Sequence, residues 1–439
     1  MEYKLSTFNN RLIVNGHTLI YNSLTGKLVV VKNIELTSWD VLETMALKNS
    51  TWGKNLNEAG ILINNNVNEI EILEERIREG MSNVDEFFLH INPTLDCNFQ
   101  CWYCYENHLP SSIMEEEQIQ STMNLISKLV HKKEIKRLVL GFFGGEPLLH
   151  FDKVAKRLIQ YAGDLCKELN KSLYISFTTN GFLLTNEIIA WLSHYSCGMQ
   201  ITLDGGKAHH DKTRFCKGGA GSFDKIVKNI KNLLKEGIKV IVRINFTTRN
   251  ISSVEGILDS FVDLSAENKK YVNFDFQRVW QDRESSNDEA EREASKIRTQ
   301  FSNQGFKVLT NYLPQDVRNP CYGDKVNHAL INYNGDVFGC TARDFNPLNR
   351  IGILEKNGDI SYDIEKYRNW RASKFSKDIC KSCRIAPLCG GGCMQKAYEQ
   401  RNLPECTLGY SEEDKDNLII NLLDYIISNT QPTLNTISL

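Results

Sequence analysis

Cys97-Asn-Phe-Gln-Cys101-Trp-Tyr-Cys104 places three cysteines in a C-x₃-C-x₂-C spacing, just after the extended run at residues 88–94. Three thiolates on one loop supply ligands for three irons of a [4Fe–4S] cube and leave the fourth iron without a protein ligand. A complete set of four cysteines makes an electron carrier, whereas an open metal position is where chemistry takes place. The alternatives for this stretch are a zinc site completed by His108 and a group of three buried thiols.

The cysteine spacing resembles that of the radical S-adenosylmethionine (SAM) superfamily, whose open iron binds the amino and carboxylate groups of SAM. The resemblance implies that Cys97, Cys101 and Cys104 hold a [4Fe–4S] cluster, with Tyr103 beside the bound SAM. The expected cofactors of this region are therefore one cluster and one SAM molecule.

Length and charge limit the class of protein. The chain has 439 residues and a formal net charge of −2. This length predicts two or three domains, and the balanced charge favours neither nucleic acid nor a membrane surface as a partner. No apolar run reaches the ~18 residues of a membrane span, and the N-terminus lacks the apolar core of a signal peptide, so we expect a cytoplasmic protein.

The cysteine content points to metal. Thirteen cysteines in a cytoplasmic protein are not expected to form disulfides, and most of them are clustered. Cys166, Cys197 and Cys216 fall outside every cluster, and we expect them to be buried structural thiols.

Between residues 87 and 307, extended apolar runs alternate with helical patterns. Such repetition predicts an α/β fold with a parallel sheet. Six strand–helix units are too few for a closed eight-fold barrel, and they match the partial (β/α)₆ barrel that the resemblance to radical SAM cores implies. The predicted strands lie at 87–93, 137–143, 172–178, 199–204, 239–246 and 271–279, and the predicted helices at 118–130, 151–169, 186–196, 223–234 and 254–264.

Short polar motifs follow the predicted strands, at the edge of a parallel sheet where function collects. The Gly-Gly-Glu element at 144–146 follows the second strand, and its glycines let a backbone approach a ligand closely. By resemblance this element binds the amino group of SAM, while the Thr-Thr-Asn-Gly turn at 178–181 suits ribose hydroxyls. Thr202 and Arg214 are candidates for the SAM carboxylate, with an Asp211–Arg214 salt bridge as the structural alternative. The residues predicted to contact SAM are Tyr103, Gly144, Gly145, Glu146, Thr178, Asn180, Thr202, Arg214 and Arg243.

Residues 1–86 form a predicted small module of their own. Apolar runs flank Asn15-Gly16, which is a strong hairpin signal, and helices are predicted from Ser38 and over 69–78. Strands and small helices at this size suit a winged-helix-like module. Many peptide-modifying radical SAM enzymes carry such a module to hold a leader peptide by strand addition, and the alternative is a packing domain without a ligand.

Residues 308–439 carry seven further cysteines in the pattern C-x₁₃-G-x₄-C, then C-x₂-C-x₅-C-x₃-C, then one more Cys. The pattern resembles the SPASM domain, named for subtilosin, pyrroloquinoline quinone, anaerobic sulfatase and mycofactocin maturation, and a zinc ribbon is the alternative. The resemblance implies two auxiliary [4Fe–4S] clusters, which makes three in all. The outer cluster is assigned to Cys380, Cys383, Cys389 and Cys406, and the inner one to Cys321, Cys340 and Cys393.

The inner set is one ligand short. Its fourth iron is therefore either open, and available to a substrate thiolate, or held by an oxygen such as that of Asp324. Two other segments complete the chain. The charged segment 281–299 is expected to be a solvated helix or linker, and Ser411 to Asp414 form a capping box before the amphipathic run at 418–427.

The resemblance covers residues 87–410 and implies an enzyme that reduces SAM and uses the 5′-deoxyadenosyl radical to take a hydrogen from a substrate carbon. We expect a maturase that cross-links a precursor peptide, with a Cys thioether as the favoured product. Carbon–carbon or carbon–oxygen cross-linking and formylglycine formation are the alternatives. The expected partners are that peptide and a low-potential donor such as ferredoxin or flavodoxin.

One residue position separates these activities. Sulfatase maturases carry an essential Asp directly after the second SPASM cysteine, where this chain has Thr341, and Asp344 is the candidate substitute as proton acceptor. From a different class, a three-cluster electron-transfer protein would need neither the Gly-Gly-Glu nor the Thr-Thr-Asn-Gly element, which therefore argue against it.

Overall fold

The computed structural model describes residues 3–32, 34–36, 38–48, 50–82, 85–282, 289–309, 317–429 and 437–438. Its contacts divide the chain into two compact units. The terminal unit comprises Met1–Asn83, Asn311–Val326 and Ile364–Leu439, and the central unit comprises Val84–Thr310 and Asn327–Asp363. The three-domain division drawn from the sequence stays a prediction.

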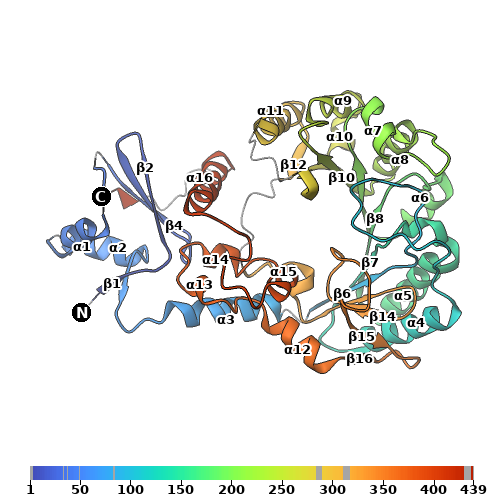
Figure 1. Cartoon of the computed structure of the whole chain (residues 1–439), viewed down its shortest axis with the longest axis horizontal. Helices are drawn as coiled ribbons and strands as arrows, with labels where there is room; N and C mark the ends of the chain where they lie inside the picture. The colour runs from blue at the N-terminus through green and yellow to red at the C-terminus, as the bar shows by residue number, and fades with distance from the viewer. Residues whose placement is uncertain are drawn as a thin grey trace. The chain divides into compact units, whose positions relative to one another are not determined.

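The central unit is built on one large, mostly parallel sheet (Figure 1). Its order is β12-β11-β10-β9-β8-β7-β6-β13-β14-β15-β16, parallel from β12 to β13 and antiparallel from there on. The parallel strands are β6 (Glu86–Ile91), β7 (Arg137–Phe142), β8 (Ser172–Thr179), β9 (Cys197–Leu203), β10 (Lys239–Phe246), β11 (Val272–Arg278), β12 (Lys307–Leu309) and β13 (His328–Ile331). The antiparallel strands are β14 (Asp336–Phe338), β15 (Arg350–Leu354) and β16 (Ile360–Tyr362).

The α/β class and all six predicted core strands are confirmed. Each strand from β6 to β11 overlaps its predicted run, because apolar, β-branched and aromatic residues fill both faces of a covered parallel sheet. The sheet then gains β12 and β13, which were not predicted since each is short and lies outside the strand–helix alternation.

Helices lie on the outer side of this curved sheet in Figure 1. Three predictions of helix extent were wrong. The segment 151–169 opens with the π-helix η2 (Phe151–Ala155), the helix predicted over 186–196 ends at Leu192, and that over 254–264 ends at Asp259. The helical elements are α4 (Glu116–His131), η1 (Pro147–His150), α5 (Lys156–Glu168), α6 (Asn186–Leu192), α7 (Lys207–Thr213), α8 (Phe223–Lys235), η3 (Ile251–Ser253), α9 (Glu255–Asp259), α10 (Ala266–Lys269), η4 (Trp280–Asp282) and α11 (Glu289–Asn303).

Helix α11 confirms the helix in the prediction of a solvated helix or linker at 281–299, but one of its faces is buried rather than solvated. It buries Ala290, Ala294, Ile297 and Phe301, which recur at helical spacing along one face. The Phe301 ring lies 4.7 Å from Phe274 in an edge-to-face arrangement. Arg292 and Lys296 are exposed on the other face, and small alanines on the inner face hid the apolar stripe.

The terminal unit contains a second sheet in the order β17-β4-β3-β2. Strands β2 and β3 form the predicted hairpin, and Asn15 and Gly16 both have positive φ, 50° and 78°, as a type I′ turn requires. Among the described residues no strand pairs with the outer edge of β2, where Ile13 and Val14 are exposed. The strands are β1 (Tyr3–Leu5), β2 (Asn9–Val14), β3 (His17–Asn22), β4 (Lys27–Val31), β5 (Leu62–Asn64), which pairs with β1, and β17 (Ile437–Ser438).

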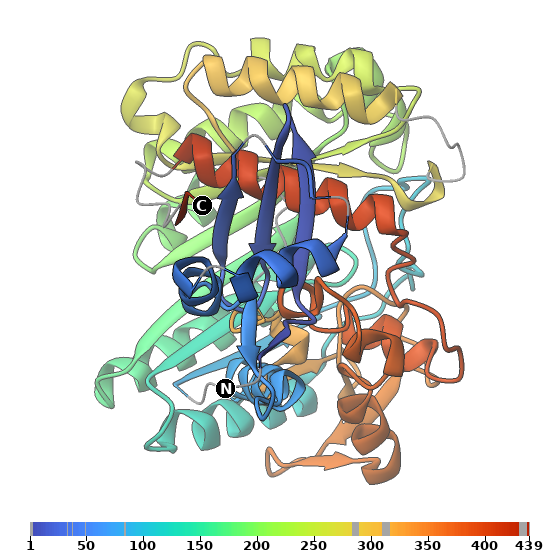
Figure 2. The same ribbon diagram turned by 90° about the vertical axis from the view of Figure 1, so that its left-hand side faces the viewer.

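Helices complete the terminal unit. The capping box is confirmed, because the Ser411 hydroxyl accepts from the Asp414 N–H at 3.1 Å and the Asp414 carboxylate accepts from the Ser411 N–H at 2.8 Å. Helix α16 packs Ile419 and Leu423 against Tyr21 and Leu28 of the sheet (Figure 2). The helical elements are α1 (Trp39–Lys48), α2 (Ser50–Glu58), α3 (Glu69–Met81), η5 (Tyr322–Asp324), α12 (Ile364–Ala372), α13 (Asp378–Lys381), α14 (Ala386–Cys389), α15 (Met394–Glu399) and α16 (Glu412–Asn429).

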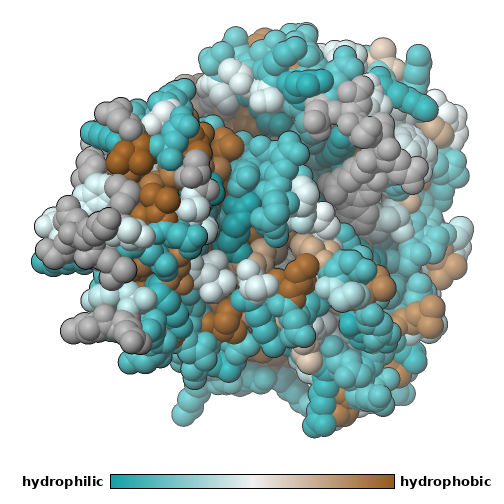
Figure 3. Space-filling view, turned by 60° about the vertical axis from the view of Figure 1, so that its left-hand side comes forward, coloured by the Kyte–Doolittle hydropathy of each residue, from teal (hydrophilic) through white to brown (hydrophobic). Residues whose placement is uncertain are grey.

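The face visible in Figure 3 is mostly hydrophilic, with separate hydrophobic patches. None of the described helices combines the length and the apolar character needed to cross a membrane.

The packing of α11 predicts a large effect of truncating Phe301. We expect Phe301→Ala to lower the unfolding free energy of the central unit by ~3–5 kcal/mol, because it leaves a cavity among aromatic rings. Urea denaturation followed by tryptophan fluorescence measures this. Arg292→Ala, at an exposed position of the same helix, should change stability by less than about 0.5 kcal/mol. Equal, small effects of the two substitutions would show that α11 is not part of the core.

Candidate active site

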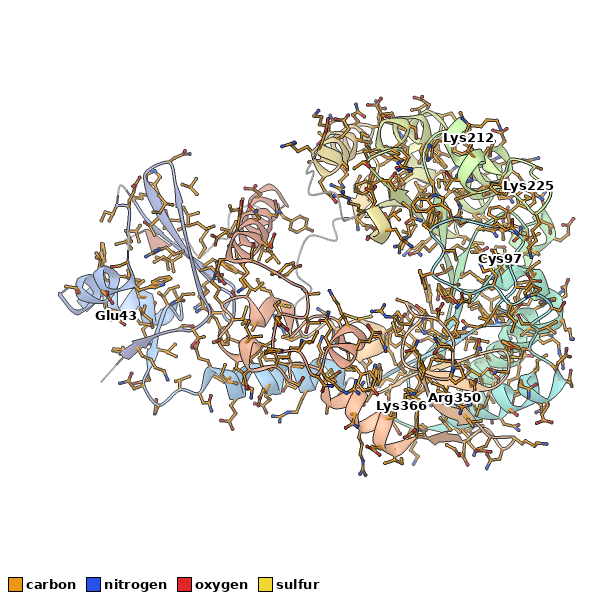
Figure 4. The ribbon with its side chains drawn as sticks, viewed as in Figure 1. Glu43, Cys97, Lys212, Lys225, Arg350 and Lys366 are labelled. Atoms are coloured by element: carbon orange, nitrogen blue, oxygen red, sulfur yellow. The ribbon has the colours of Figure 1, made fainter. Side chains whose placement is uncertain are left out.

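The cysteine loop follows β6 at the carboxyl end of the strand. Cys97 is buried, Cys101 is half-buried and Cys104 is exposed, and all three are free thiols. In Figure 4 Cys97 lies within the body of the central unit, whereas Lys212 and Lys225 lie at its outer rim. The Phe99 N–H lies 3.4 Å from the Cys97 sulfur, and burial raises the pKa of the Cys97 thiol to about 12. A thiolate at this position therefore needs a compensating positive charge, which a metal supplies.

Gly144 and Gly145 let the loop after β7 lie directly against the backbone just before Cys97. A Cβ at Gly145 would lie 2.1 Å from the Asp96 carbonyl oxygen, and one at Gly144, which has φ +104°, would lie 2.4 Å from that of Thr94. The Gly145 N–H donates to the Thr94 carbonyl and the Glu146 N–H to the Asp96 carbonyl. We expected these glycines to let the backbone approach a ligand. In the structure they let it approach the backbone of the cysteine loop.

Glu146 ties the loop to the third strand. Its buried carboxylate accepts from the Thr179 hydroxyl at 2.6 Å, from the Asn180 N–H at 2.8 Å and from the Leu148 N–H at 3.0 Å. Burial raises the pKa of Glu146, and these hydrogen bonds oppose the rise. Asn180 also donates to the Asn98 side chain at 2.8 Å. Thr179 rather than Thr178 makes the contact at the end of β8.

Arg214 is buried beneath the cysteine loop. Its guanidinium donates to the Tyr103 hydroxyl at 2.7 Å and lies over the Phe99 ring, and Tyr103 in turn donates to the Asp204 carboxylate. Burial raises the pKa of Asp204 and that of Tyr103. The Arg214 Nε and one Asp204 oxygen are buried without a protein partner in the described structure.

The alternative salt bridge from Asp211 to Arg214 was wrong. Asp211 instead accepts from the Ser222 and Phe223 N–H groups and pairs with Lys207 at 3.0 Å. Asp211 therefore stabilises the connection between α7 and α8. Arg214 is paired with the cysteine loop through Tyr103 instead.

Thr202 and Arg243 are directly paired across β9 and β10, where both are half-buried. The Arg243 Nε donates to the Asn245 side chain at 3.0 Å. The two predicted SAM-contact residues on these strands are thus neighbours on one face of the sheet, and Arg243 already has a protein partner.

The segment carrying Thr341 and Asp344 packs on the far end of the cysteine loop, within the central unit. The Tyr105 hydroxyl donates to the Thr341 carbonyl at 3.2 Å, and the Asn107 amide donates to the Asp344 carboxylate at 2.9 Å. Glu106 between them is buried, and neither of its carboxyl oxygens has a partner in the described residues. Burial and the charge of Asp344 raise the pKa of Glu106 to about 9.

In the terminal unit, Cys380, Cys383, Cys389 and Cys406 line one pocket. Thr407 also lines it, and its buried hydroxyl has no partner among the described residues. Four convergent thiols and an unsatisfied hydroxyl fit a cluster with a hydrogen-bond donor to its sulfur.

Three consecutive glycines separate Cys389 from Cys393. Gly390, Gly391 and Gly392 all have positive φ, and a Cβ at Gly391 would lie 2.8 Å from the Phe375 backbone. Only glycine adopts this conformation readily over three residues. The turn that spaces the last two cysteines of the C-x₅-C-x₃-C run therefore depends on them.

Lys374 joins the segments of Cys321 and Cys393. Its buried ammonium donates to the Asp324 carboxylate at 2.8 Å and to the Gly392 carbonyl at 2.6 Å. Asp324, the predicted oxygen alternative for the inner cluster, thus already pairs with a cation. Cys340 belongs to the central unit, so the three-cysteine inner set stays a prediction.

The remaining cysteines fit the expectation of structural thiols in two cases. Cys166 and Cys197 are buried, whereas Cys216 is only half-buried, on a segment that pairs with the cysteine loop through Phe99. His108 lies 3.5 Å from the Cys104 sulfur. Within the described residues, no group of three or more His, Cys, Asp or Glu side chains is placed to hold a single metal ion.

Comparison with known proteins agrees with this geometry. Residues 91–261 match the family model of the Radical SAM superfamily. Over 196 residues the chain is 27% identical to the radical SAM cyclopropyl synthase TigE of Paramaledivibacter caminithermalis, a match that covers 41% of this chain but only 40% of TigE. Over 347 residues it is 24% identical to the cysteine-type anaerobic sulfatase-maturating enzyme of Clostridium novyi, covering 71% of this chain and 88% of that enzyme.

Two solved structures share the fold. The anSMEcpe structure with bound AdoMet has a TM-score of 0.59 at 17% identity and covers 78% of this chain and 98% of that one. Streptococcus suis SuiB bound to the precursor peptide SuiA has a TM-score of 0.50 at 15% identity and covers 90% and 96%.

These findings define an α/β enzyme with a mostly parallel sheet and a cysteine loop at the end of its first core strand. The chain contains a radical SAM domain and is similar to an anaerobic sulfatase-maturating enzyme and to a radical SAM cyclopropyl synthase. A radical SAM domain implies one [4Fe–4S] cluster and SAM as cofactors.

Sequence reasoning missed Thr179, Asp204 and Glu106 as site residues. The two-residue period of a strand was the available signal for Thr179, because Ile175, Phe177 and Thr179 share one buried face of β8. Asp204 and Glu106 carried no local signal, since their partners lie far away in the sequence.

Protonation of His210 should destabilise the site. Its Nδ1 accepts from the Asp204 N–H and its Nε2 contacts the Ser222 hydroxyl, so the ring is held neutral. Burial lowers the pKa of His210 from 6.5 to about 3. The folded chain therefore binds fewer protons than the unfolded chain between these values, and stability falls as pH drops from 6.5 toward 3.

We expect His210→Asn to lose less stability than the unchanged protein between pH 7 and pH 5. Urea midpoints at the two pH values measure the difference. The matched control is His209→Asn at a half-exposed neighbour, which should keep the steep dependence. Parallel pH dependences of all three proteins would contradict the prediction.

Proposed function

We propose that this chain is a SPASM-type radical SAM maturase that installs a Cys thioether cross-link in a precursor peptide. The observation that carries the proposal is the cysteine loop, because Cys97, Cys101 and Cys104 stand at the carboxyl end of β6 with Arg214 buried behind them. When bound, the cluster and SAM supply a 5′-deoxyadenosyl radical that removes a hydrogen atom from the substrate.

Protein groups would hold SAM around this loop. Thr202 and Arg243 form one candidate contact surface, and Arg214 offers a buried positive charge whose Nε lacks a protein partner in the described structure. Asn180, fixed through the Glu146 carboxylate, offers a polar side chain beside Cys97. Charged and polar side chains thus surround the cysteine loop, and some of their atoms have no protein partner in the described structure. Such groups suit a zwitterionic ligand that also carries hydroxyl groups.

A peptide substrate is supported by the terminal unit. Strand β2 offers an open edge with Ile13 and Val14 exposed, as strand addition of a leader peptide requires. The similarity to TigE and the fold shared with peptide-bound SuiB point to the same substrate class. Auxiliary clusters on the seven cysteines of the C-terminal pattern would take up the electron released when the cross-link forms.

Asp344 is the proposed proton acceptor. Asn107 orients one of its oxygens, and the other has no partner among the described residues. It is the carboxylate of the Cys340–Phe345 run, and it lies beside the cysteine loop where a substrate thiol or amide proton would be released. Glu106 is buried next to Asp344, and burial together with the Asp344 charge raises the pKa of Glu106 to about 9, which favours a neutral Glu106 beside a charged Asp344.

The deciding experiment is mass spectrometry of the anaerobically reconstituted protein with reductant, SAM and a precursor peptide encoded beside its gene. Deoxyadenosine together with a peptide lighter by two hydrogens per event, joined at a Cys sulfur, is the expected result. We expect Cys97→Ala to abolish deoxyadenosine, and Cys321→Ala to lose the cross-link while deoxyadenosine still forms. Undiminished SAM cleavage by Cys97→Ala would overturn the proposal.

Asp344→Asn separates SAM cleavage from product formation. The amide keeps the shape and the Asn107 contact but cannot take a proton, so cross-linking should fall by about 10²–10⁴-fold while deoxyadenosine formation changes little. Asp359→Asn, at an exposed ion pair of the same unit, is the matched control and should behave like the unchanged enzyme. Equal cross-linking by both variants would remove Asp344 from the mechanism.

Formylglycine formation is the second candidate. The 24% identity over 88% of the Clostridium novyi maturase favours it, as does a carboxylate close to the loop despite Thr341 after Cys340. A sulfatase peptide converted to an aldehyde in the same assay would select this activity. Carbon–carbon or carbon–oxygen cross-links would be recognised by the same mass loss with a free Cys.

A further inference from the structure

One pocket of the terminal unit collects four cysteines from separate segments of the chain. They are Cys380 on α13, Cys383 in the following turn, Cys389 at the end of α14, and Cys406 before α16. All four are free thiols, and apolar side chains such as Ile385 and Leu408 line much of the rest. The polar side chains of the lining belong to Thr407, Tyr410 and Lys415.

The separation of these thiols distinguishes a cluster from a single metal ion. In the part of the chain that the structure describes, no three His, Cys, Asp or Glu side chains are placed to ligate one ion such as zinc. A cube of four irons binds each thiolate at a different corner, so its ligands stand further apart. The pocket therefore fits a [4Fe–4S] cluster with four protein ligands better than it fits zinc.

The hydroxyl of Thr407 lacks a protein partner in the described structure, although the residue is only 2% exposed. A buried polar group without a protein partner is uncommon, and it normally marks a bound ligand or water. Lys415, by contrast, pairs with Glu412 within α16. The Thr407 hydroxyl is thus a donor in the wall of a pocket whose expected occupant presents sulfur acceptors.

Two backbone contacts hold Thr407 in place beside Cys406. The Gly409 N–H donates to the Cys406 carbonyl at 3.0 Å, so Thr407 lies within a tight turn. The buried ammonium of Lys377 donates to the carbonyl just before Cys406 at 2.9 Å, and the Cys380 N–H donates to the Lys377 carbonyl at 3.0 Å. Lys377 therefore joins the segment of Cys406 and Thr407 to that of Cys380.

Lys377 also supplies a positive charge at this place. It is 8% exposed and forms no ion pair within the described residues. A cluster with four thiolate ligands carries a net negative charge that increases on reduction, so cations and hydrogen-bond donors stabilise its reduced form more than its oxidised form. Lys377 and Thr407 would act on such a cluster in the same direction.

We propose that the Thr407 hydroxyl donates a hydrogen bond to a sulfur of the outer [4Fe–4S] cluster and raises the reduction potential of that cluster. The inference rests on the part of the proposed function that takes Cys380, Cys383, Cys389 and Cys406 as cluster ligands. The couple is [4Fe–4S]²⁺/[4Fe–4S]¹⁺. One electron enters from a reductant, which is oxidised by one electron, and no covalent bond forms or breaks.

The test uses the full-length chain with the outer set of cysteines left for iron. A background of Cys97→Ala/Cys101→Ala/Cys104→Ala/Cys321→Ala removes the ligands of the other two centres, and anaerobic reconstitution should leave about four irons per chain. Potentiometric titration followed by electron paramagnetic resonance measures the midpoint potential of the remaining cluster. In this background, Thr407→Val keeps the shape of the side chain and removes the donor.

We expect the midpoint potential to fall in Thr407→Val. At the potential where the background protein is half reduced, the ratio of reduced to oxidised cluster should drop about tenfold, which is about 59 mV for a one-electron couple. Thr407→Ser retains a hydroxyl and should keep most of the potential. Thr44→Val, the same change at an exposed position of α1 in this unit, is the matched control and should not alter it.

Electron–nuclear double resonance on the reduced cluster, before and after exchange into D₂O, detects the bonding proton itself. One exchangeable proton coupling should be present in the background protein and in Thr407→Ser, and missing from Thr407→Val. If Thr407→Val takes up no iron, Thr407→Ala replaces it in both measurements, because alanine also lacks the hydroxyl.

An unchanged midpoint potential in the iron-loaded valine or alanine variant would overturn the inference. Identical proton couplings with and without the hydroxyl would also overturn it, as would a background protein that binds zinc and no iron. These outcomes leave the assays of the enzyme with all its cysteines unaffected. Loss of both deoxyadenosine and the cross-link there would refute the proposed function, and the midpoint potential would still decide the role of Thr407.

Discussion

The central unit depends on one buried carboxylate, that of Glu146. It accepts two hydrogen bonds from the end of β8 and one from Leu148 in η1, and its own N–H donates to the backbone just before Cys97. Hydrogen bonds to a buried charge contribute about 1.5–3 kcal/mol each, and leaving that charge unpaired costs more than a neutral group would. The Glu146 carboxylate therefore fixes the cysteine loop, the Gly144–Glu146 loop and the end of β8 relative to one another. The positions of the three thiols depend on these contacts.

Much of this arrangement could be predicted from the sequence. The six core strands, the Asn15–Gly16 turn and the Ser411 capping box follow from periodicity and turn chemistry, which act over a few residues. The cysteine loop was recognised from its spacing, and the comparisons confirm the radical SAM domain around it. Local rules sufficed wherever the determining partners were neighbours in the chain.

The remainder depended on contacts between distant residues. Tyr103, Asp204 and Arg214 form their relay across more than 100 positions, so no local pattern announced Asp204 as a site residue or excluded Asp211 as the partner of Arg214. Helix α11 was predicted as a solvated helix or linker, and its buried face was missed because that face uses alanine, whose burial is decided by the sheet beneath it. In both the Arg214 contacts and helix α11, tertiary packing decided an outcome that the local sequence did not indicate.

The run Gly390–Gly391–Gly392 bears on how the terminal unit is made. Glycine surrenders more backbone freedom on folding than any other residue, so a newly synthesised chain samples this turn in many shapes. Cys389 and Cys393 lie on either side of it and are assigned to different clusters. Under the proposed assignment to two clusters, ligation of Cys389 would restrict the backbone conformations open to Cys393, so this turn would couple the loading of one cluster to that of the other.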